Sequence, residues 1–266
     1  MSKNGNTYFD RSVIEPGGET EGRTEMSQNP RQSKSIRAQL LTAMQVGEYA
    51  HCDRLPRESV LSEMLGISRT QLRDILASLD REGFITRRHG VGTIINRHVL
   101  GAPARMDIEV EFLDMIRQSG HTPGVAFVRA ADDKADNKVA AQLGIPTGTP
   151  ILRISRLCTA DGRPAIYCED VVEKALAKGD YTIQDFKLPI FHFLQRFCGI
   201  YPYLDLTDVR PAAADAALAE IFQGPMGTPL LNMEEVDYDI DGRPVFCSSE
   251  YFVDGIFRHT VMRKKL

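Results

Sequence analysis

The sequence of 266 residues has no long apolar run, few cysteines and no tryptophan. No apolar stretch approaches the ~18 residues that a membrane-spanning helix needs, and the N-terminus lacks the basic and apolar regions of a signal peptide. The cysteines are odd in number and scattered, without a Cys-x-x-Cys pair, which indicates reduced thiols that mostly pack in a core, with a redox sensor as the alternative. They are Cys52, Cys158, Cys168, Cys198 and Cys247. The sequence therefore predicts a cytoplasmic protein with no membrane partner.

Ligand spacing of the kind found in zinc sites is also absent. His51 and His89 lie in a basic part of the chain, but neither has a second ligand at zinc-like spacing. We expect surface or phosphate-contacting roles for both histidines. No metal and no other cofactor is predicted.

The net charge of −4 is unevenly distributed along the chain. Residues 31–98 carry 11 Lys and Arg against 7 Asp and Glu, whereas residues 99–266 carry 18 against 24. Small charge excesses alone usually mark solvated faces. Here the basic segment coincides with a helix-turn-helix pattern, and a basic module on an acidic body is typical of a nucleic-acid-binding protein with a separate second function.

The segment from Leu55 to Ile95 predicts two short helices, a tight turn and a glycine-tipped hairpin. Ser68 is a good N-cap, and Gln71 completes a capping box. The apolar face of the second helix, at i, i+3, i+4 and i+7, consists of Leu72, Ile75, Leu76 and Leu79. Two helices joined through a turn with Gly66 form a helix-turn-helix, and the hairpin that follows makes it winged.

Basic residues occupy the side of this motif away from the leucines. Arg69, Thr70 and Arg73 lie at the start of the second helix, from which a recognition helix contacts base edges in the major groove. Arg87, Arg88 and His89 precede the tip of the hairpin. The segment is therefore predicted to bind double-stranded DNA.

The sequence LPRESVLSEMLGISRTQLRDILASLDREGFITRRHGVGT resembles the DNA-binding domain of the GntR family of bacterial transcription regulators. In that family the second helix and the basic wing hold the operator. Arg57 and Ser59 stand in the family's Leu-Pro-Ser-Glu-Arg motif, whose arginine touches DNA. The DNA-binding positions that we expect are Arg57, Ser59, Ser68, Arg69, Thr70, Gln71, Arg73, Arg87, Arg88, His89, Gly90, Gly92 and Thr93.

Composition divides the chain into four parts. Residues 1–30 are rich in Gly, Glu, Asn and Ser, which predicts a disordered tail. Residues 31–96 form the winged helix-turn-helix domain, including a helix from Ile36 to about Tyr49. Residues 97–106 interrupt all periodicity and form a linker. Residues 107–266 form the second domain, which begins with a helix over about 108–118.

The second domain contains an internal repeat. Gly148-Thr149-Pro150 recurs 79 positions on, and Asp161-Gly162-Arg163-Pro164 recurs 80 positions on. Each copy reads as a short helix, a Gly/Pro turn, a strand, an Asp-Gly hairpin turn and a return strand. Two copies predict an antiparallel sheet with helices packed on one face, and between them residues 190–197 predict another helix. The chain is therefore expected to be an α+β protein of two domains.

This half resembles the effector-binding (UTRA) domain of the HutC branch of the GntR family, which is similar in fold to chorismate lyase. The matching motifs are GHTPG, LGIPTGTPILRISRLCTADGRPAIYCED and EYFVDGIFRHTVMRKK. In that family a small acidic or phosphorylated metabolite sits in a cleft over the sheet. The resemblance implies that Arg156 holds an anionic group, that Glu169 and Glu250 take hydroxyls or amines, and that the loop with His121, Thr122 and Gly124 contacts an anion.

Charged residues in mostly apolar strands support a pocket, because an unpaired buried charge is costly. Arg156, Glu169 and Glu250 lie on predicted strands, and Arg258 lies beyond the last one. Since strands alternate faces, each of these side chains has the alternative of pointing to water.

We expect a homodimeric repressor that a small-molecule effector releases from a palindromic operator. The alternative is a chorismate-lyase-like enzyme fused to a DNA-binding module, with Arg156 holding a carboxylate and Glu169 as general acid or base. Only likeness of fold supports that alternative, and the DNA-binding module argues against it.

Overall fold

The computed structural model describes residues 30–102 and 105–263, and the chain divides into two compact units between Asn96 and Arg97. The predicted N-terminal tail lies outside the described residues, apart from Pro30, with which the first helix begins. The predicted linker, residues 97–106, falls entirely within the second unit and contains a short helix, α4 (Arg97–Leu100).

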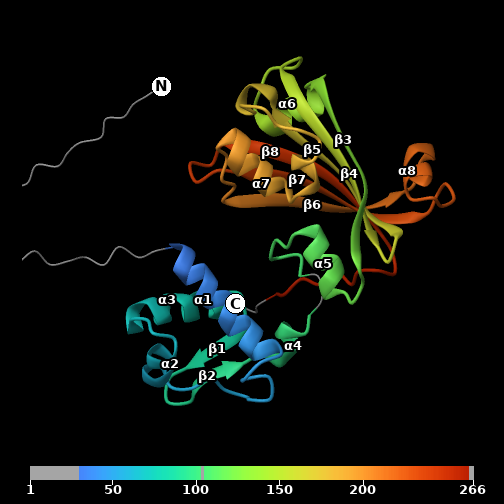
Figure 1. Cartoon of the computed structure of the whole chain (residues 1–266). Coiled ribbons are helices and arrows are strands. Elements are labelled where there is room, and N and C mark those ends of the chain that lie inside the picture. Colours follow the sequence, from blue (N-terminus) through green and yellow to red (C-terminus); the bar gives the residue numbers. More distant parts are fainter. Residues whose placement is uncertain (1–29, 103–104, 264–266) are drawn as a thin grey trace, which may run out of the picture. The chain divides into compact units, whose positions relative to one another are not determined.

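The first unit is a three-helix base with a two-stranded wing (Figure 1). Its elements are α1 (Pro30–Gln45), α2 (Glu58–Met64), α3 (Arg69–Arg81), β1 (Ile85–Arg88) and β2 (Gly92–Ile95). The side chains of Leu40, Met44, Leu61 and the four leucine-face residues of α3 are buried. Helix α1 starts six residues before the predicted position and ends four residues earlier, so its length in the structure is 16 residues.

The ends of α3 follow from its sequence. The Ser68 side chain accepts a hydrogen bond from the backbone N–H of Gln71 at 3.1 Å, which satisfies one of the free N–H groups of the first turn. Gly83 follows the helix at φ 77°, a conformation that glycine adopts without the cost of a Cβ. The capping predicted from the sequence is therefore present.

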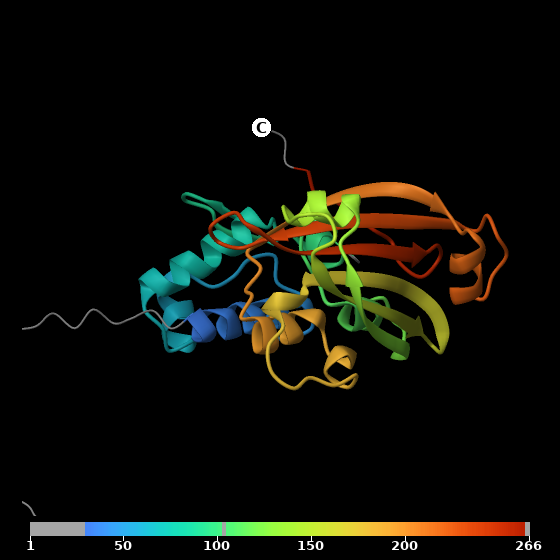
Figure 2. The same cartoon turned by 90° about the horizontal axis from the view of Figure 1, so that it is seen from above.

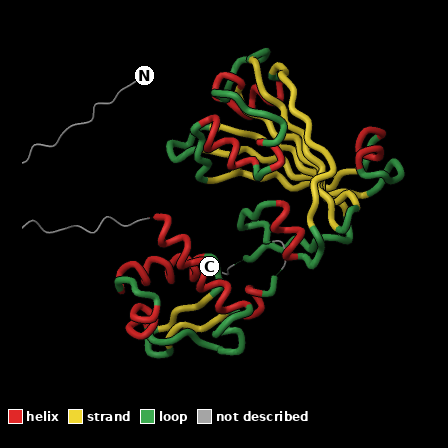
Figure 3. Tube along the Cα trace, viewed as in Figure 1, coloured by secondary structure: helices red, strands yellow, loops and turns green. Residues whose placement is uncertain are grey.

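The second unit is a six-stranded antiparallel sheet with helices on both faces (Figure 3). The strands are β3 (Pro123–Lys134), β4 (Pro150–Ala160), β5 (Arg163–Glu173), β6 (Leu204–Ala213), β7 (Pro229–Tyr238) and β8 (Pro244–Val253). The other elements are α5 (Phe112–Gln118), α6 (Asn137–Leu143), α7 (Ile190–Phe193), α8 (Ala216–Ile221), two 3₁₀ turns, η1 (Lys174–Leu176) and η2 (Asp185–Lys187), and a π-helical turn, η3 (Leu194–Cys198). The two-domain α+β architecture is confirmed.

The internal repeat forms the two halves of this sheet. The strand order β3-β4-β5-β8-β7-β6 joins the copies through β5 and β8, and the two halves form two curved arms when viewed from above (Figure 2). Asp136 and Asp215 each cap the repeat helix by accepting from the N–H three residues on. The Gly148 and Gly227 N–H groups donate to Ala135 and Ala214, each at 2.7 Å.

The two faces of the sheet have different coverings. Helices α6 and α8 pack on one face, against clusters that include Ile151 and Leu157. The opposite face carries the α7–η3 segment, packed on Ile154, and α5, packed on Ile166. The prediction of helices on one face holds for the repeat helices alone, because α5 and α7 come from segments outside the repeat.

Candidate functional site

The start of α3 presents exposed polar groups, as the sequence predicts. Ser68, Arg69 and Thr70 are exposed, whereas Gln71 is half-buried and its N–H is used by the cap. Arg57 and Ser59 at the start of α2 are exposed too. These side chains are exposed to solvent and so are available for contact with a ligand.

Glu58 joins the recognition helix to the wing, a contact that the sequence reasoning did not include. Its two carboxylate oxygens accept from Arg73 Nε and Arg87 Nη2, both at 2.8 Å. The hydrogen bond from Arg73, followed by that from Arg87, outweighs burial and lowers the pKa of Glu58. Glu58 therefore holds two of the predicted DNA-binding arginines at fixed positions.

The wing exposes most of its predicted contact residues. Arg88, His89, Gly90 and Gly92 are exposed. Thr93 is only 8% exposed, because it pairs with Arg87 in the hairpin and its carbonyl accepts from the Leu55 N–H. The prediction that the Thr93 side chain faces DNA is therefore not supported by its position.

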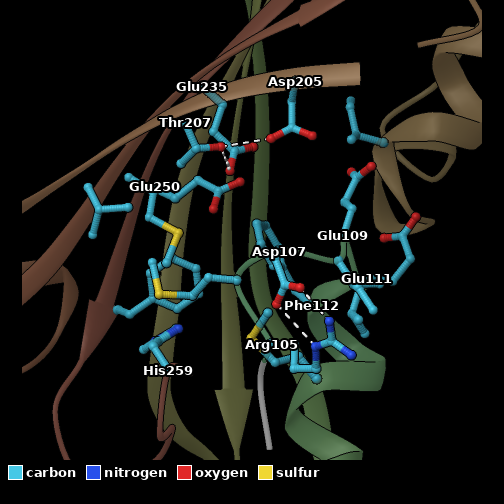
Figure 4. A pocket seen from close by; sticks show the side chains of 18 of the residues that line it. Arg105, Asp107, Glu109, Glu111, Phe112, Asp205, Thr207, Glu235, Glu250 and His259 are labelled. Carbon is cyan, nitrogen blue, oxygen red and sulfur yellow. Dashed lines mark hydrogen bonds and ion pairs between the residues drawn. The ribbon is translucent and has the colours of Figure 1, made fainter. Parts of the chain in front are cut away.

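A cavity of about 490 Å³ lies in the second unit on the sheet face opposite α6 and α8 (Figure 4). Its walls come from residues 105–112, from β6, β7 and β8, and from the start of α7. The apolar lining includes Phe112, Ile190, Phe191, Phe246 and Phe252. The volume of this cavity and its apolar lining are typical of a site that binds a small organic molecule.

Arg156 lines this cavity, but its guanidinium is already engaged. Nε and Nη2 donate to Asp170 Oδ2 at 3.2 and 2.8 Å, and Nη1 donates to the Leu188 carbonyl at 3.4 Å. Burial opposes the charge of Arg156, but the Asp170 carboxylate outweighs burial and raises the pKa of the guanidinium. The other arginine of the cavity lining, Arg105, is also paired: its Nε and Nη2 donate to the two carboxylate oxygens of Asp107.

Five further carboxyl groups line the cavity. We call four of them the carboxylate cluster: Glu109, Asp205, Glu235 and Glu250. The fifth is Glu111, which interacts electrostatically with Arg156. Thr207 Oγ1 lies 2.8 Å from Asp205 and 3.0 Å from Glu235, and Glu250 accepts from Ser248 Oγ at 3.4 Å. Among the described residues, none of the four has an Arg, Lys or His nitrogen within ion-pair distance. Figure 4 shows Asp205, Glu235 and Glu250 next to one another.

Burial and repulsion between neighbouring acids raise the pKa of Glu109, Glu235 and Glu250, which therefore stay protonated at higher pH than usual. Burial, followed by repulsion from Asp205, raises the pKa of Glu235 to about 7. Burial, followed by repulsion from Glu235, raises the pKa of Glu250 well above its ordinary value. Asp237, two residues after Glu235 and 2% exposed, has its pKa raised to about 8 by burial and then by Glu109.

His259 contributes an unsatisfied nitrogen to the same cavity. Its Nε2 is buried and has no hydrogen-bond partner, and the ring packs edge-on against Phe252 with centroids 4.8 Å apart. Burial lowers the pKa of His259, which favours the neutral imidazole. A neutral Nε2 is able to accept or donate one hydrogen bond to a ligand, depending on its tautomer.

Of the predicted effector-binding residues, Arg156 and Glu250 line the cavity and the others lie elsewhere. Glu169 sits on the opposite face of β5, where it accepts from Tyr167 Oη at 2.7 Å. His121 Nδ1 and the Thr122 N–H both contact the Asp161 carboxylate, and a Cβ on Gly124 would meet Thr159 Oγ1 at 2.6 Å. Arg258 is exposed and outside the cavity lining.

Two simple alternatives find no support in the part of the chain that the structure describes. No group of three or more His, Cys, Asp or Glu residues there is arranged to hold a metal ion. No described helix has both the length and the apolar character needed to cross a membrane.

Both halves of the chain match known protein families. Residues 32–95 match "Bacterial regulatory proteins, gntR family", and residues 118–257 match the UTRA domain. The transcriptional repressor NagR of Bacillus subtilis (strain 168) is 26% identical over 203 residues, which cover 76% of this chain and 82% of NagR.

Solved structures show the same fold. The possible transcriptional regulator YydK of Bacillus subtilis has a TM-score of 0.68 at 18% identity, covering 88% of this chain and 99% of YydK. PhnF of Mycobacterium smegmatis has a TM-score of 0.55 at 21% identity, covering 87% of this chain and all of PhnF. The matched families and relatives are transcription regulators, which disfavours the enzyme alternative.

Proposed function

The chain belongs to the GntR family of bacterial regulatory proteins and carries a UTRA domain, and from this premise we propose that it is a repressor released from its operator by a small molecule. The observation that carries the proposal is the pairing, in one chain, of an exposed arginine-headed α3 with a ligand-sized cavity in a separate unit. The name of NagR as a transcriptional repressor supports the direction of control.

For the DNA side of the proposal, Arg69 and Thr70 contact base edges from the N-terminal turn of α3. Arg73 and Arg87, held by Glu58, contact phosphates beside them, and Arg57, Ser59, Arg88 and His89 complete the binding surface. Phosphate contacts position a protein on the duplex, and base contacts specify the sequence. A homodimer would place two such surfaces on a palindromic operator. Because chromosomal DNA is the partner, we place the protein in the cytoplasm.

For the ligand side, the effector occupies the cavity of the UTRA unit and binds one arrangement of the protein better than the other. An acidic or phosphorylated metabolite is the prediction from the resemblance. The two described arginines that line the cavity are both paired with aspartates, so they offer such a metabolite little free positive charge.

A fluorescence anisotropy titration with DNA from upstream of the protein's own gene tests the proposal. We expect salt-sensitive binding of the full-length protein, because phosphate contacts release counterions. The control is a scrambled duplex of the same length. Equal affinity for both duplexes, or no binding of either one, would contradict the proposed function.

A further inference from the structure

The two repeats of the UTRA unit place different charges at equivalent positions of the cavity. In the first repeat Ile154 pairs with Asp170 and Arg156 pairs with Cys168. In the second repeat Met233 pairs with Glu250 and Glu235 pairs with Ser248. The strand offsets of 79 and 80 residues are those of the repeated motifs, so Glu235 stands where Arg156 does and Glu250 stands where Asp170 does.

This exchange leaves one carboxyl group without its counter-ion. In the first repeat the guanidinium of Arg156 neutralises the buried Asp170 carboxylate. In the second repeat the equivalent position carries a second carboxyl group, and Glu250 is only 7% exposed. A buried carboxylate is strongly destabilised unless a cation or several hydrogen bonds compensate it. The available compensation within the described residues is the 3.4 Å contact from Ser248 and the neighbouring Glu235.

Thr207 shows the same deficit of positive charge. Its hydroxyl lies within hydrogen-bond distance of both Asp205 and Glu235, but it has one proton to donate. The Thr207 hydroxyl can donate to only one of the two carboxyl groups. The other group therefore either carries a proton of its own or receives no hydrogen bond from Thr207.

On these grounds, and resting on the proposed function, we propose that the effector of this protein is a small organic cation, an amine or guanidine whose charged group binds the carboxylate cluster. The cation takes the place in the second repeat that the Arg156 guanidinium fills in the first. The N–H groups of the cation donate to the carboxylates of Glu235 and Glu250, and Asp205 and Glu109 lie nearby (Figure 4).

The rest of the cavity fits the body of such a molecule better than it fits a bare ion. Phe112, Phe191, Phe246 and Phe252 line it, and aromatic rings bind apolar groups and cations alike. The orphan Nε2 of His259 offers a neutral partner for a second polar group. A cavity of about 490 Å³ is of the size that small-molecule sites have, and the described residues form no metal-ion cluster.

The test is calorimetric titration of the full-length protein at pH 8 with phenethylamine, agmatine and spermidine. The neutral and anionic analogues 2-phenylethanol and 3-phenylpropanoate serve as comparisons. We expect at least one amine to bind, and its affinity to fall about tenfold or more in the double variant Glu235→Gln/Glu250→Gln, since each charge-assisted hydrogen bond contributes substantially to binding. Both substitutions keep the shape of the side chain.

The matched control is Glu169→Gln, on the opposite face of the sheet, which should bind the amine as the wild-type protein does. Binding of the anion alone overturns the inference, as does an amine panel in which no affinity depends on Glu235 and Glu250. Operator binding, measured in parallel, separates the two proposals. Intact operator binding that an anion releases would leave the proposed function standing without the cationic effector, whereas amine binding without any operator affinity would leave only the cation site.

Discussion

Arg156 and Glu235 occupy equivalent strand positions in the two repeats, so a guanidinium in one half of the sheet corresponds to a carboxyl group in the other. Their partners correspond as well, because Asp170 and Glu250 lie opposite Ile154 and Met233. The first repeat thus contains its own counter-ion, whereas the second supplies two acids to the cavity. This difference determines which charge a ligand needs in order to neutralise the acids of the second repeat.

An arginine at position 235 tests directly whether positions 156 and 235 are equivalent. In Glu235→Arg, the new side chain should pair with Glu250 as Arg156 pairs with Asp170 and should stabilise the protein by about 1–2 kcal/mol at pH 8.5. Amine binding should be lost because the site is filled. Thermal unfolding with and without the amine measures both effects. Glu235→Gln separates loss of repulsion from gain of an ion pair, and a Glu235→Arg variant that keeps its amine affinity would refute the equivalence.

The stability of the UTRA unit should fall as pH rises. The folded-state pKa values of Glu235 (about 7) and Asp237 (about 8) lie above those of the unfolded chain, where both groups ionise near pH 4. Between these limits the folded protein holds protons that the unfolded chain has lost, so its free energy of unfolding decreases from about pH 5 to pH 8.5 and levels off above. The acids that act on these two groups are Glu109, Asp170, Asp205 and Glu250.

We expect the loss of stability to be on the order of 2 kcal/mol. The measurement is denaturant unfolding at pH 5.5, 7 and 8.5. In Glu235→Gln/Asp237→Asn the decrease should be smaller than in the wild-type protein but still present, because Glu109, Glu111 and Glu250 keep raised pKa values. An amine ligand should stabilise more at pH 8.5 than at pH 5.5, because it binds the ionised carboxylates. Stability that rises with pH in the wild-type protein would exclude the raised pKa values.

Removing Arg156 should mainly lower the stability of the fold and not the affinity for the ligand. Arg156→Met leaves the Asp170 carboxylate buried and unpaired, which should cost about 3–5 kcal/mol. In Arg156→Met/Asp170→Leu, both charges are gone, and most of that loss should be recovered. Denaturant unfolding of the two variants provides the comparison. Equal stability of Arg156→Met and the wild-type protein would show that the ion pair is not structurally important.

Arg69 should contribute to DNA affinity and to sequence preference. Its exposed position in the first turn of α3 is where base-reading arginines act, so Arg69→Ala should cost about 1–3 kcal/mol in operator binding and relax the preference at one base pair. Arg81→Ala, at the exposed C-terminal end of the same helix, is the matched control and should bind normally. Anisotropy titrations with operator and single-base variants measure both. Equal losses of operator affinity in Arg69→Ala and Arg81→Ala would show that the duplex does not bind at the start of α3.

The sequence was sufficient to predict the local elements. The Ser68 N-cap and the four leucine-face positions of α3 are in the structure as predicted, because capping and helical periodicity depend on neighbours along the chain. The hairpins of the repeat were predicted for the same reason.

The cavity required information that local patterns lack. The resemblance implied that Glu169 lines the same pocket as Arg156, but Arg156 pairs with Cys168, so the acid of β5 on the same face is Asp170. A register difference of one residue moves a side chain to the other face of the sheet. The pairing of β5 with β8, which brings Glu250 to the cavity, joins residues about 80 positions apart. Comparing the two repeats position by position would have drawn attention to Glu235.

The residues before α5 were missed for another reason. Glu109 and Glu111 lie in an irregular segment that the sequence predicted as the first turn of a helix over about 108–118, and both line the cavity. Irregular segments carry no periodicity from which the direction of a side chain follows.

The most direct test of the whole account is ligand-dependent release of DNA, measured as the anisotropy of a labelled duplex from upstream of the protein's own gene. The amine with the highest calorimetric affinity is added to the complex with the wild-type protein and to that with Glu235→Gln/Glu250→Gln. The account predicts that the amine releases the duplex from the wild-type protein and that at least tenfold more is needed with the double variant. Release at the same amine concentration from both proteins, or by 3-phenylpropanoate instead of the amine, would contradict it.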